Sequence, residues 1–198
     1  MGANLGYFTV PLSRLVGEQG HVYAIEPVSV FRAVLRTNVQ RFGVPERVAV
    51  LPVALGREDG GTVTLETAEV DGVARHGMTR VVGGTQAPGS ALVHEAPVRR
   101  PDTLLAHLDR LDFLKVDIEG YETEVMPLFA PLVARHRPAI EVEAGSPDST
   151  AMLRALFEPL GYVACTLHEN GLVPLDDAAR RGLSADAEVY FWPSARRL

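Results

Sequence analysis

The sequence predicts an α/β fold in which a mostly parallel, twisted sheet carries helices on both faces. Short apolar runs alternate with segments whose apolar residues recur at helical spacing, and this alternation is typical of strand–helix–strand units with right-handed crossovers. The chain also opens on a small-residue loop, residues 2–6, and Glu26 follows about twenty residues later. A glycine turn followed by an acid at that interval indicates an adenosine-ribose site in such a fold.

Length and composition favour one domain spanning residues 1–198, with 46% hydrophobic and 22% charged residues. No apolar run approaches the roughly 18 residues of a membrane span and no signal segment is found, so we expect a cytoplasmic protein without membrane contact. The net charge of −6 argues against nucleic acid as the main partner. Cys165 is the single cysteine, which excludes an internal disulfide, and the histidines lack metal-ligand spacing, so no metal is expected.

Local patterns predict each element in order. Apolar residues at helical spacing, ended by glycine or proline, predict helices at 8–16, 31–42, 102–108, 125–133 and 149–160. The first helix is expected to bury Phe8, Leu12, Leu15 and Val16. Pro127 and Pro131 are expected to kink or split the fourth helix, and Ser149 to cap the fifth.

Apolar runs bounded by turn residues predict strands at 21–26, 48–55, 62–67, 111–117, 138–143, 162–167 and 188–192. We expect the last two to be antiparallel neighbours at one edge of the sheet. Residues 68–100 contain several glycines and show no clear periodicity. A loop this long inside a compact domain is usually functional, so we interpret it as an insertion that forms a lid or an acceptor-binding region. The alternative is a surface loop without a role.

The opening loop departs from the dinucleotide fingerprint, which would require glycines at positions 2, 4 and 7. Asn4 and Tyr7 occupy two of those positions, and their side chains would obstruct a pyrophosphate. NAD and FAD are therefore disfavoured, and a ligand with adenosine but no phosphates, such as S-adenosylmethionine, fits better. Glu26 would accept hydrogen bonds from both ribose hydroxyls. The alternatives are a simple tight turn and a solvated acid at a strand end.

Several stretches together resemble the FkbM-type S-adenosylmethionine-dependent methyltransferases. They are Gly2-Ala3-Asn4-Leu5-Gly6-Tyr7, Glu26-Pro27, Asn38, Ala54-Leu55-Gly56, the run from Lys115 to Glu122, and Arg137-Pro138 with Glu141 and Glu143. The resemblance extends from residue 2 to about residue 165, and the Lys-x-Asp-x-Glu-Gly run is its most diagnostic part. Residues 68–100 fall where the family is variable. The Arg-, Ala- and Val-rich composition with a single lysine indicates a GC-rich bacterial source.

The resemblance implies a class I, Rossmann-like methyltransferase fold and S-adenosylmethionine as cofactor. It also implies O-methylation of a small-molecule hydroxyl acceptor, on a sugar or a natural product. The loop residues would line the methionine end of the cofactor: Gly2, Ala3, Asn4 and Gly6. The next strand end would hold the ribose through Glu26, beside Pro27. Val53 and Ala54 would flank the adenine, and Asp117 would face the transferring methyl group.

Methyl transfer to a hydroxyl requires positioning and removal of the hydroxyl proton. Asp117 and Glu119 are the catalytic candidates, as the base or as the group that orients the acceptor, although Glu119 has the alternative of capping the following helix. The further candidates are Glu143, His76 and His94. Because ligands bind outside the carboxyl ends of parallel strands, Glu26, residues 53–55 and the acids at 117 and 119 are expected to converge on the opening loop.

The family places a strand directly before the glycine loop, in the centre of the sheet between the strands at 21–26 and 111–117. Here only Met1 precedes the loop, so we expect the first central strand to be missing from a truncated or mis-started sequence. A non-catalytic or truncated methyltransferase-fold binding domain is the alternative function. A nicotinamide-dependent enzyme is the third hypothesis, disfavoured by Asn4 and Tyr7. The sequence leaves the oligomeric state open.

Overall fold

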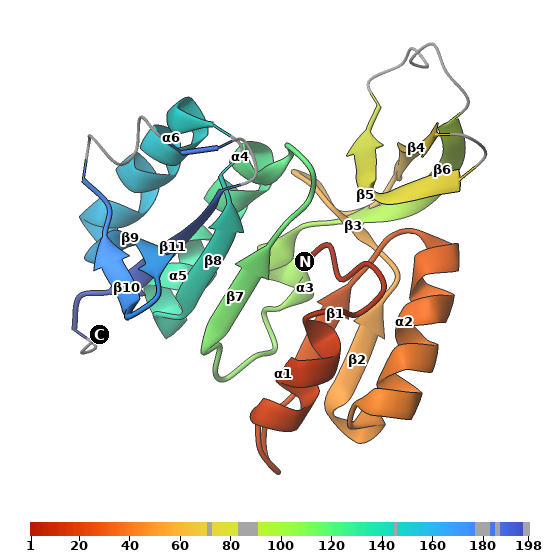
Figure 1. Ribbon diagram of the computed structural model, residues 1–198, viewed down its shortest axis with the longest axis horizontal. Coiled ribbons are helices and arrows are strands. Elements are labelled where there is room, and N and C mark those ends of the chain that lie inside the picture. The colour runs from red at the N-terminus through yellow and green to blue at the C-terminus, as the bar shows by residue number, and fades with distance from the viewer. Residues whose placement is uncertain (71–72, 83–90, 145, 177–182, 185–186, 196–198) are drawn as a thin grey trace. The chain divides into compact units, whose positions relative to one another are not determined.

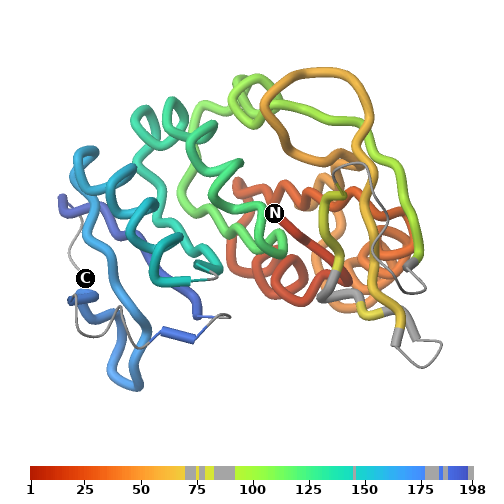
Figure 2. The backbone as a smooth tube through the Cα atoms, turned by 90° about the horizontal axis from the view of Figure 1, so that it is seen from above, coloured from red at the N-terminus to blue at the C-terminus, as the bar shows by residue number. Residues whose placement is uncertain are grey.

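The computed structural model describes residues 1–70, 73–82, 91–144, 146–176, 183–184 and 187–195. The chain divides into two compact units, Met1–Arg99 and Arg100–Leu198. Figure 2 traces the first unit in red to yellow and the second in green to blue. The expected organisation as one domain over residues 1–198 stays a prediction.

The first unit begins with two parallel strands and two helices. β1 (Val22–Ile25) pairs with β2 (Val48–Leu51), which follows the short helix η1 (Pro45–Arg47). α1 (Thr9–Leu15) packs on β1, and α2 (Ser29–Phe42) packs on β2 (Figure 1). The core between these elements is formed by Ala24, Leu35 and Val39, with Ala3, Val10, Val48 and Val50 packed around them.

The expected apolar stripe of α1 is wrong. The buried residues of this helix are Thr9 and Ser13, whereas Leu15 is 78% exposed. Ser13 Oγ donates to Val10 O at 2.7 Å and accepts from Val44 N at 3.0 Å. The small polar side chain therefore joins α1 to the segment after α2, a long-range contact that helical spacing does not reveal.

A second sheet completes the first unit. Its strands are β3 (Ala54–Leu55), β4 (Thr62–Val70), β5 (Val73–Val81) and β6 (Ala91–Arg99), in the order β3-β6-β4-β5. The strand expected at 62–67 is confirmed, but the single strand expected at 48–55 is split at Pro52. The expected irregular loop at 68–100 is also wrong in its described parts, because β5 and β6 pair antiparallel with β4. A register shift between Thr67 and Glu69 interrupts the alternation along β4.

The second unit contains a five-stranded mixed sheet in the order β10-β9-β11-β8-β7. Its strands are β7 (Phe113–Val116), β8 (Ala139–Glu143), β9 (Tyr162–His168), β10 (Gly171–Pro174) and β11 (Glu188–Pro193). β7 and β8 are parallel, whereas the other neighbours are antiparallel, and the expected antiparallel pairing of β9 with β11 is confirmed.

The expectation of a mostly parallel sheet is wrong, because five pairs of described strands are antiparallel and three are parallel. Parallel pairing needs a crossover connection, and β4 to β6 and β9 to β10 follow one another without a described helix. Within the described residues, β1 pairs with β2 alone and β7 with β8 alone. The expected loss of a central strand stays a prediction.

The helices of the second unit follow the proline positions. The predicted helix at 125–133 is split, as expected, into α4 (Glu122–Val125), η2 (Met126–Phe129) and α5 (Ala130–His136), and a proline lies in the first turn of each of the last two. The remaining helices are α3 (Pro101–Leu104), α6 (Pro147–Phe157) and η3 (Glu158–Leu160). Ser146, and not Ser149 as expected, caps α6, because its hydroxyl accepts from Ser149 N at 3.1 Å.

The two faces of the second sheet differ in character because alternate side chains of a strand point to opposite faces. One face is apolar and buried, with Leu114, Val116, Ile140, Val142, Val189 and Phe191. Phe157 of α6 packs on this face, with its ring centroid 5.1 Å from that of Phe191. The opposite face presents charged residues at the carboxyl ends of β7 and β8, where the candidate site lies.

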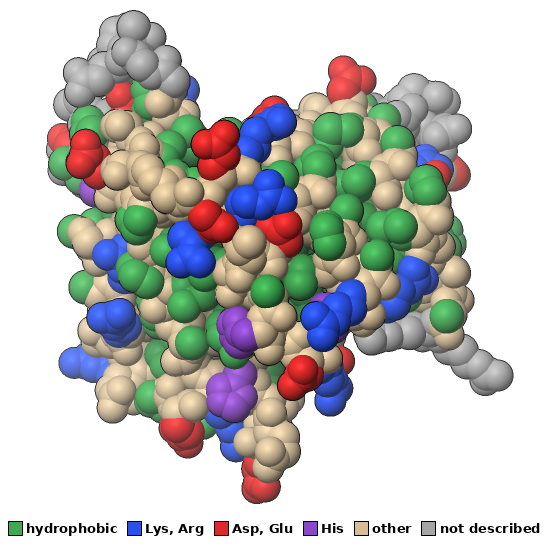
Figure 3. Space-filling view, turned by 180° about the vertical axis from the view of Figure 1, so that it is seen from behind, with side chains coloured by type: hydrophobic (Ala, Val, Ile, Leu, Met, Phe, Trp, Pro, Cys, Tyr) green, Lys and Arg blue, Asp and Glu red, His purple; other side chains and the backbone are tan. Residues whose placement is uncertain are grey.

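Charged residues also lie on the surface, and in the face drawn in Figure 3 the basic and acidic side chains are interspersed. Pairs such as Arg99 with Asp59 (2.9 Å) and Arg154 with Glu158 (2.5 Å) are exposed and contribute at most about 1 kcal/mol each. Across the part of the chain that the structure describes, no helix has the length and apolar character needed to cross a membrane.

Candidate functional site

The opening loop makes a tight reversal at the end of β1. Gly2, Asn4 and Gly6 have positive φ angles of 66°, 49° and 92°, a region that favours glycine and asparagine. Ala3 N donates to Ile25 O at 3.0 Å, which joins the loop to β1. A Cβ at Gly6 would lie 2.6 Å from Leu35 Cδ1. Glycine at this position therefore allows α2 to approach the loop closely.

Glu26 lies directly after β1 and is 4% exposed, so its alternative interpretation as a solvated acid is wrong. Its Oε2 accepts from Asn4 N and its Oε1 from Val28 N, both at 2.8 Å. Burial raises the pKa of Glu26, while the two backbone bonds and Arg32 partly offset this effect. Because each carboxylate oxygen has two acceptor positions, the side chain can still accept a bond from a diol at each oxygen.

Two further side chains hold this region, and sequence reasoning gave them no role. Arg32, in the first turn of α2, donates through one terminal nitrogen to the carbonyls of Glu26 (3.1 Å) and Pro27. Asn38 Nδ2 donates to Leu5 O at 2.8 Å. Their signal in the sequence was their position next to the apolar residues Phe31, Leu35 and Val39, which α2 buries.

The other predicted residues of the first unit lie in varied surroundings. Val53 is half-buried between β2 and β3, and Ala54 packs in the core with Val28 and Phe31. His94 lies on β6, half-buried, and burial lowers its pKa. The side chain of His76 lies outside the described residues.

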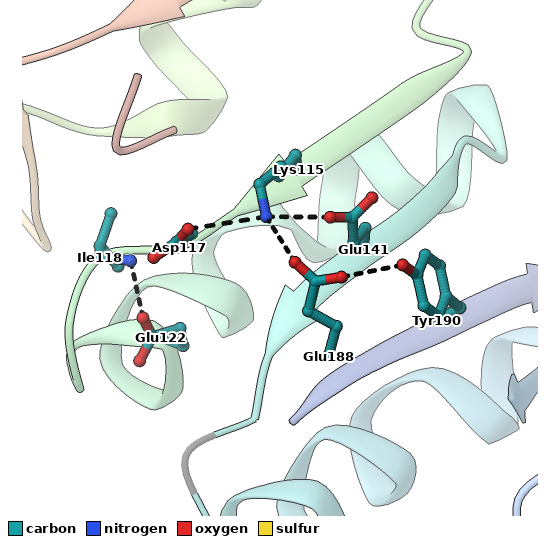
Figure 4. Close-up of polar contacts among 7 residues, drawn as sticks. All are labelled: Lys115, Asp117, Ile118, Glu122, Glu141, Glu188 and Tyr190. Atoms are coloured by element: carbon teal, nitrogen blue, oxygen red, sulfur yellow. Dashed lines mark hydrogen bonds and ion pairs between the residues drawn. The ribbon is translucent and has the colours of Figure 1, made fainter. Parts of the chain in front are cut away.

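A buried cation organises the polar face of the second unit (Figure 4). Lys115 Nζ lies 2.9 Å from Glu141 Oε1, 3.2 Å from Glu188 Oε1 and 3.6 Å from Asp117 Oδ2. Burial alone would lower the pKa of Lys115, but the hydrogen bond to Glu141 and the negative charges of Glu141, Asp117 and Glu188 together raise it. Tyr190 OH donates to Glu188 Oε2 at 2.9 Å, so the network extends from β7 to β11.

The turn after β7 presents Asp117 and Glu119. Glu119 is exposed and has a φ of 56°, followed by Gly120 with a φ of 91°. Glu122 is buried and holds this turn, because its Oε1 accepts from Ile118 N at 2.7 Å. The N-cap residue of α4 is Tyr121, whose side chain makes no capping hydrogen bond, and the alternative role of Glu119 at this helix end stays a prediction. Partial loss of solvent around its carboxyl group, together with the charges of Asp117 and Glu122, raises the pKa of Glu119.

Glu143, at the end of β8, completes an acidic cluster with the two acids of the turn. Burial raises its pKa to about 7, and the negative charges of Asp117 and Glu119 add to the shift. Asp117 and Glu119 therefore lie close enough to Glu143 for their charges to raise its pKa. The structure brings together these acids in the second unit, and the loop with Glu26 in the first. The expected convergence of the two groups stays a prediction.

The signal for the Lys115 network was present in the sequence. Glu141 and Glu143 in β8, and Glu188 and Tyr190 in β11, stand two residues apart, the spacing that places side chains on one face of a strand. Lys115 in β7 and Asp117, just after its end, have the same spacing. Among the described residues, no group of three His, Cys, Asp or Glu side chains is arranged to hold a metal ion.

Comparisons with known proteins point to one family. The family model of the methyltransferase FkbM domain matches residues 1–164. The structure is similar to the crystal structure of methyltransferase FkbM from Methylobacillus flagellatus KT, with a TM-score of 0.58, 20% identity and 96% of this chain covered. This chain spans 42% of that protein's length.

A weaker likeness is to precorrin-6y C5,15-methyltransferase from Geobacter metallireducens GS-15, with a TM-score of 0.48 and 13% identity over 96% of this chain and 74% of that chain. A comparison with the curated proteins gave no match.

Proposed function

The chain belongs to the FkbM methyltransferase domain family, and we propose that it transfers a methyl group from S-adenosylmethionine to a hydroxyl oxygen of a small molecule, on a sugar or a natural product. Membership of the family supports methyl transfer. The observation that supports S-adenosylmethionine is the buried Glu26 carboxylate, which the loop and α2 hold through Asn4 N and Val28 N.

The residues of the first unit fit this ligand. A ribose diol can donate to the positions that remain on the two oxygens of Glu26. Asn4 at the centre of the loop fits a ligand without a pyrophosphate better than NAD. In this proposal Gly2, Ala3, Asn4 and Gly6 line the methionine end. Pro27 lies beside the ribose, and Val53 and Ala54 lie beside the adenine.

The acids of the second unit supply the remaining chemistry. S-adenosylmethionine brings a methyl group bound to a positively charged sulfur, and the protein must position the acceptor and accept its proton. Asp117 and Glu119 stand on a turn that Glu122 fixes through Ile118 N, so they are held before a ligand arrives. In this proposal residues 68–100 contact the acceptor, because the family is variable there.

The test is calorimetric titration of the chain with S-adenosylmethionine, S-adenosylhomocysteine and NAD. Binding of the first two at micromolar affinity supports the proposal, and binding of NAD alone overturns it. A chain that binds none of the three supports the non-catalytic alternative. If S-adenosylmethionine binds, transfer of an isotopically labelled methyl group to a panel of hydroxylated sugars and natural products, with the matching amines as controls, tests O-methylation.

A further inference from the structure

Glu143, at the end of β8, lies between two other acidic residues on the neighbouring chain segments. Val116 of β7 is in register with Val142 of β8, so Asp117 and Glu143 occupy the next position along the two strands. On the other side of β8, Glu143 is in register with Glu188 of β11. Neighbouring strands lie about 4.8 Å apart, so the carboxyl groups of Asp117 and Glu143 are close, and a negative charge on Asp117 makes ionisation of Glu143 less favourable.

Lys115 makes these carboxyl groups unequal. Its ammonium group lies one position earlier on the same face and contacts Asp117, Glu141 and Glu188 at 3.6 Å or less. A positive charge at that distance stabilises negative charge on those three groups. The ion pairs of Lys115 are with the neighbours of Glu143, so Glu143 is expected to take up a proton more readily than those neighbours.

Resting on the function proposed above, we propose that Glu143, and not Asp117, accepts the hydroxyl proton, while Asp117, held by Lys115, orients the acceptor. As the acceptor oxygen forms its bond to the methyl carbon, the bond from that carbon to sulfur breaks and the sulfur keeps the electron pair. The hydroxyl proton moves to the ionised carboxylate of Glu143. Neutral thioether, methyl ether and protonated Glu143 are the products, so atoms and charge balance.

The surroundings of Glu143 support this assignment. Asp117 and Glu119, on the turn after β7, and Glu122, in α4, contribute negative charge to its surroundings, and Glu188 of β11 lies opposite it in register. Glu141 lies two residues earlier on the same face of β8, where it is paired with Lys115. A pKa of about 7 suits a general base at neutral pH, because such a group is both substantially ionised and able to take up a proton.

The first test does not depend on any ligand. The carboxyl carbon of Glu143, assigned by the resonance that Glu143→Gln removes, is titrated by NMR between pH 4 and pH 9. We expect a midpoint near pH 7 that falls in Asp117→Asn, because that variant removes a neighbouring negative charge. Glu169→Gln, which changes an exposed glutamate between β9 and β10, is the control and should leave the midpoint unchanged. A midpoint near 4.5, the ordinary value for glutamate, overturns the proposal.

The second test uses an acceptor identified by the labelled-methyl assay. Glu143→Gln should lower kcat by roughly 10²- to 10⁴-fold and remove the fall in kcat on the acidic side of pH 7, with the Kd for S-adenosylmethionine unchanged. Asp117→Asn should raise the KM for the acceptor and keep that acidic fall, moved to lower pH. Full activity in Glu143→Gln overturns this inference while methyl transfer stands. If the unmodified chain does not bind S-adenosylmethionine, the proposed function itself is overturned.

Discussion

The Nζ atom of Lys115 lies 2.9 Å from Oε1 of Glu141, and both side chains are 8% exposed. A buried pair of this kind is expensive to break, because removing one partner leaves the other charge without compensation. Lys115 also contacts Glu188 and Asp117, so its ammonium group offsets negative charge from three strands or strand ends at once.

We therefore expect Lys115→Met to reduce the free energy of unfolding by roughly 3–5 kcal/mol, measured by urea denaturation at pH 7. The double variant Lys115→Met/Glu141→Leu should recover part of this loss, because it also removes the acid left unpaired. A loss below about 0.5 kcal/mol in the single variant, the range of ordinary surface substitutions, would show that the pair contributes little.

The raised pKa of Glu143 predicts how the free energy of unfolding changes with pH. Its pKa is raised to about 7 in the folded chain from the ordinary value of 4.5. Between these values the folded state binds the proton more tightly than the unfolded state, so stability falls as pH rises through this window and then levels off. Urea denaturation at pH 5, 6, 7 and 8 should show a smaller fall in Glu143→Gln than in the unmodified chain. Parallel curves for the two proteins would contradict the prediction.

The sequence predicted the order of elements well where local rules decide it. Pro127 and Pro131 split one helix into three segments because each removes a backbone donor. The direction of the strands was harder to predict. β5 and β6 fold back on β4 in a segment whose glycines and prolines suggested an irregular loop. Pairing between strands is a non-local choice that no local pattern records.

For the candidate site, the sequence likewise identified individual residues but not the contacts between distant strands. Residue spacing and the family resemblance led to Glu26 and Asp117, and the structure shows why Glu26 is buried: Asn4 N and Val28 N satisfy it. The link from Lys115 to Glu188 joins residues 73 positions apart. Such a contact depends on the register of β11 beside β8, which the sequence does not show.

Glu26→Gln should weaken S-adenosylmethionine binding by roughly 10- to 100-fold, because charge-assisted hydrogen bonds contribute about 1.5–3 kcal/mol each. An amide has one acceptor oxygen, so its NH₂ group would also face a backbone N–H donor from Asn4 or Val28. Calorimetry measures the change, and Glu46→Gln, at an exposed position in η1, is the matched control. Unchanged affinity in Glu26→Gln would exclude this carboxylate from the ligand site.

Gly161 ends η3 with a φ of 75°, and a Cβ there would lie 3.2 Å from a terminal nitrogen of Arg137. That guanidinium also lies over the ring of Tyr162, 4.9 Å from its centroid. Gly161→Ala should therefore cost more than the roughly 1–2 kcal/mol of a left-handed backbone alone. Gly61→Ala is the control, because Gly61 has a φ of 76° and a Cβ added there would meet nothing within 4 Å. If thermal denaturation shows the same loss of stability in both variants, the Arg137 side chain moves away from the added Cβ without a measurable free-energy cost.

Glu119 allows backbone strain and charge to be separated. Its φ of 56° is costly for a residue with a Cβ by roughly 1–2 kcal/mol, whereas glycine adopts it readily. Glu119→Gly should therefore be more stable than Glu119→Ala by about that amount in urea denaturation. Both variants remove a negative charge that raises the pKa of Glu143, so in both the NMR midpoint of Glu143 should fall. The two substitutions remove the same charge. If the NMR midpoint of Glu143 falls only in Glu119→Ala, the cause is therefore a change in the conformation of the turn and not the lost charge.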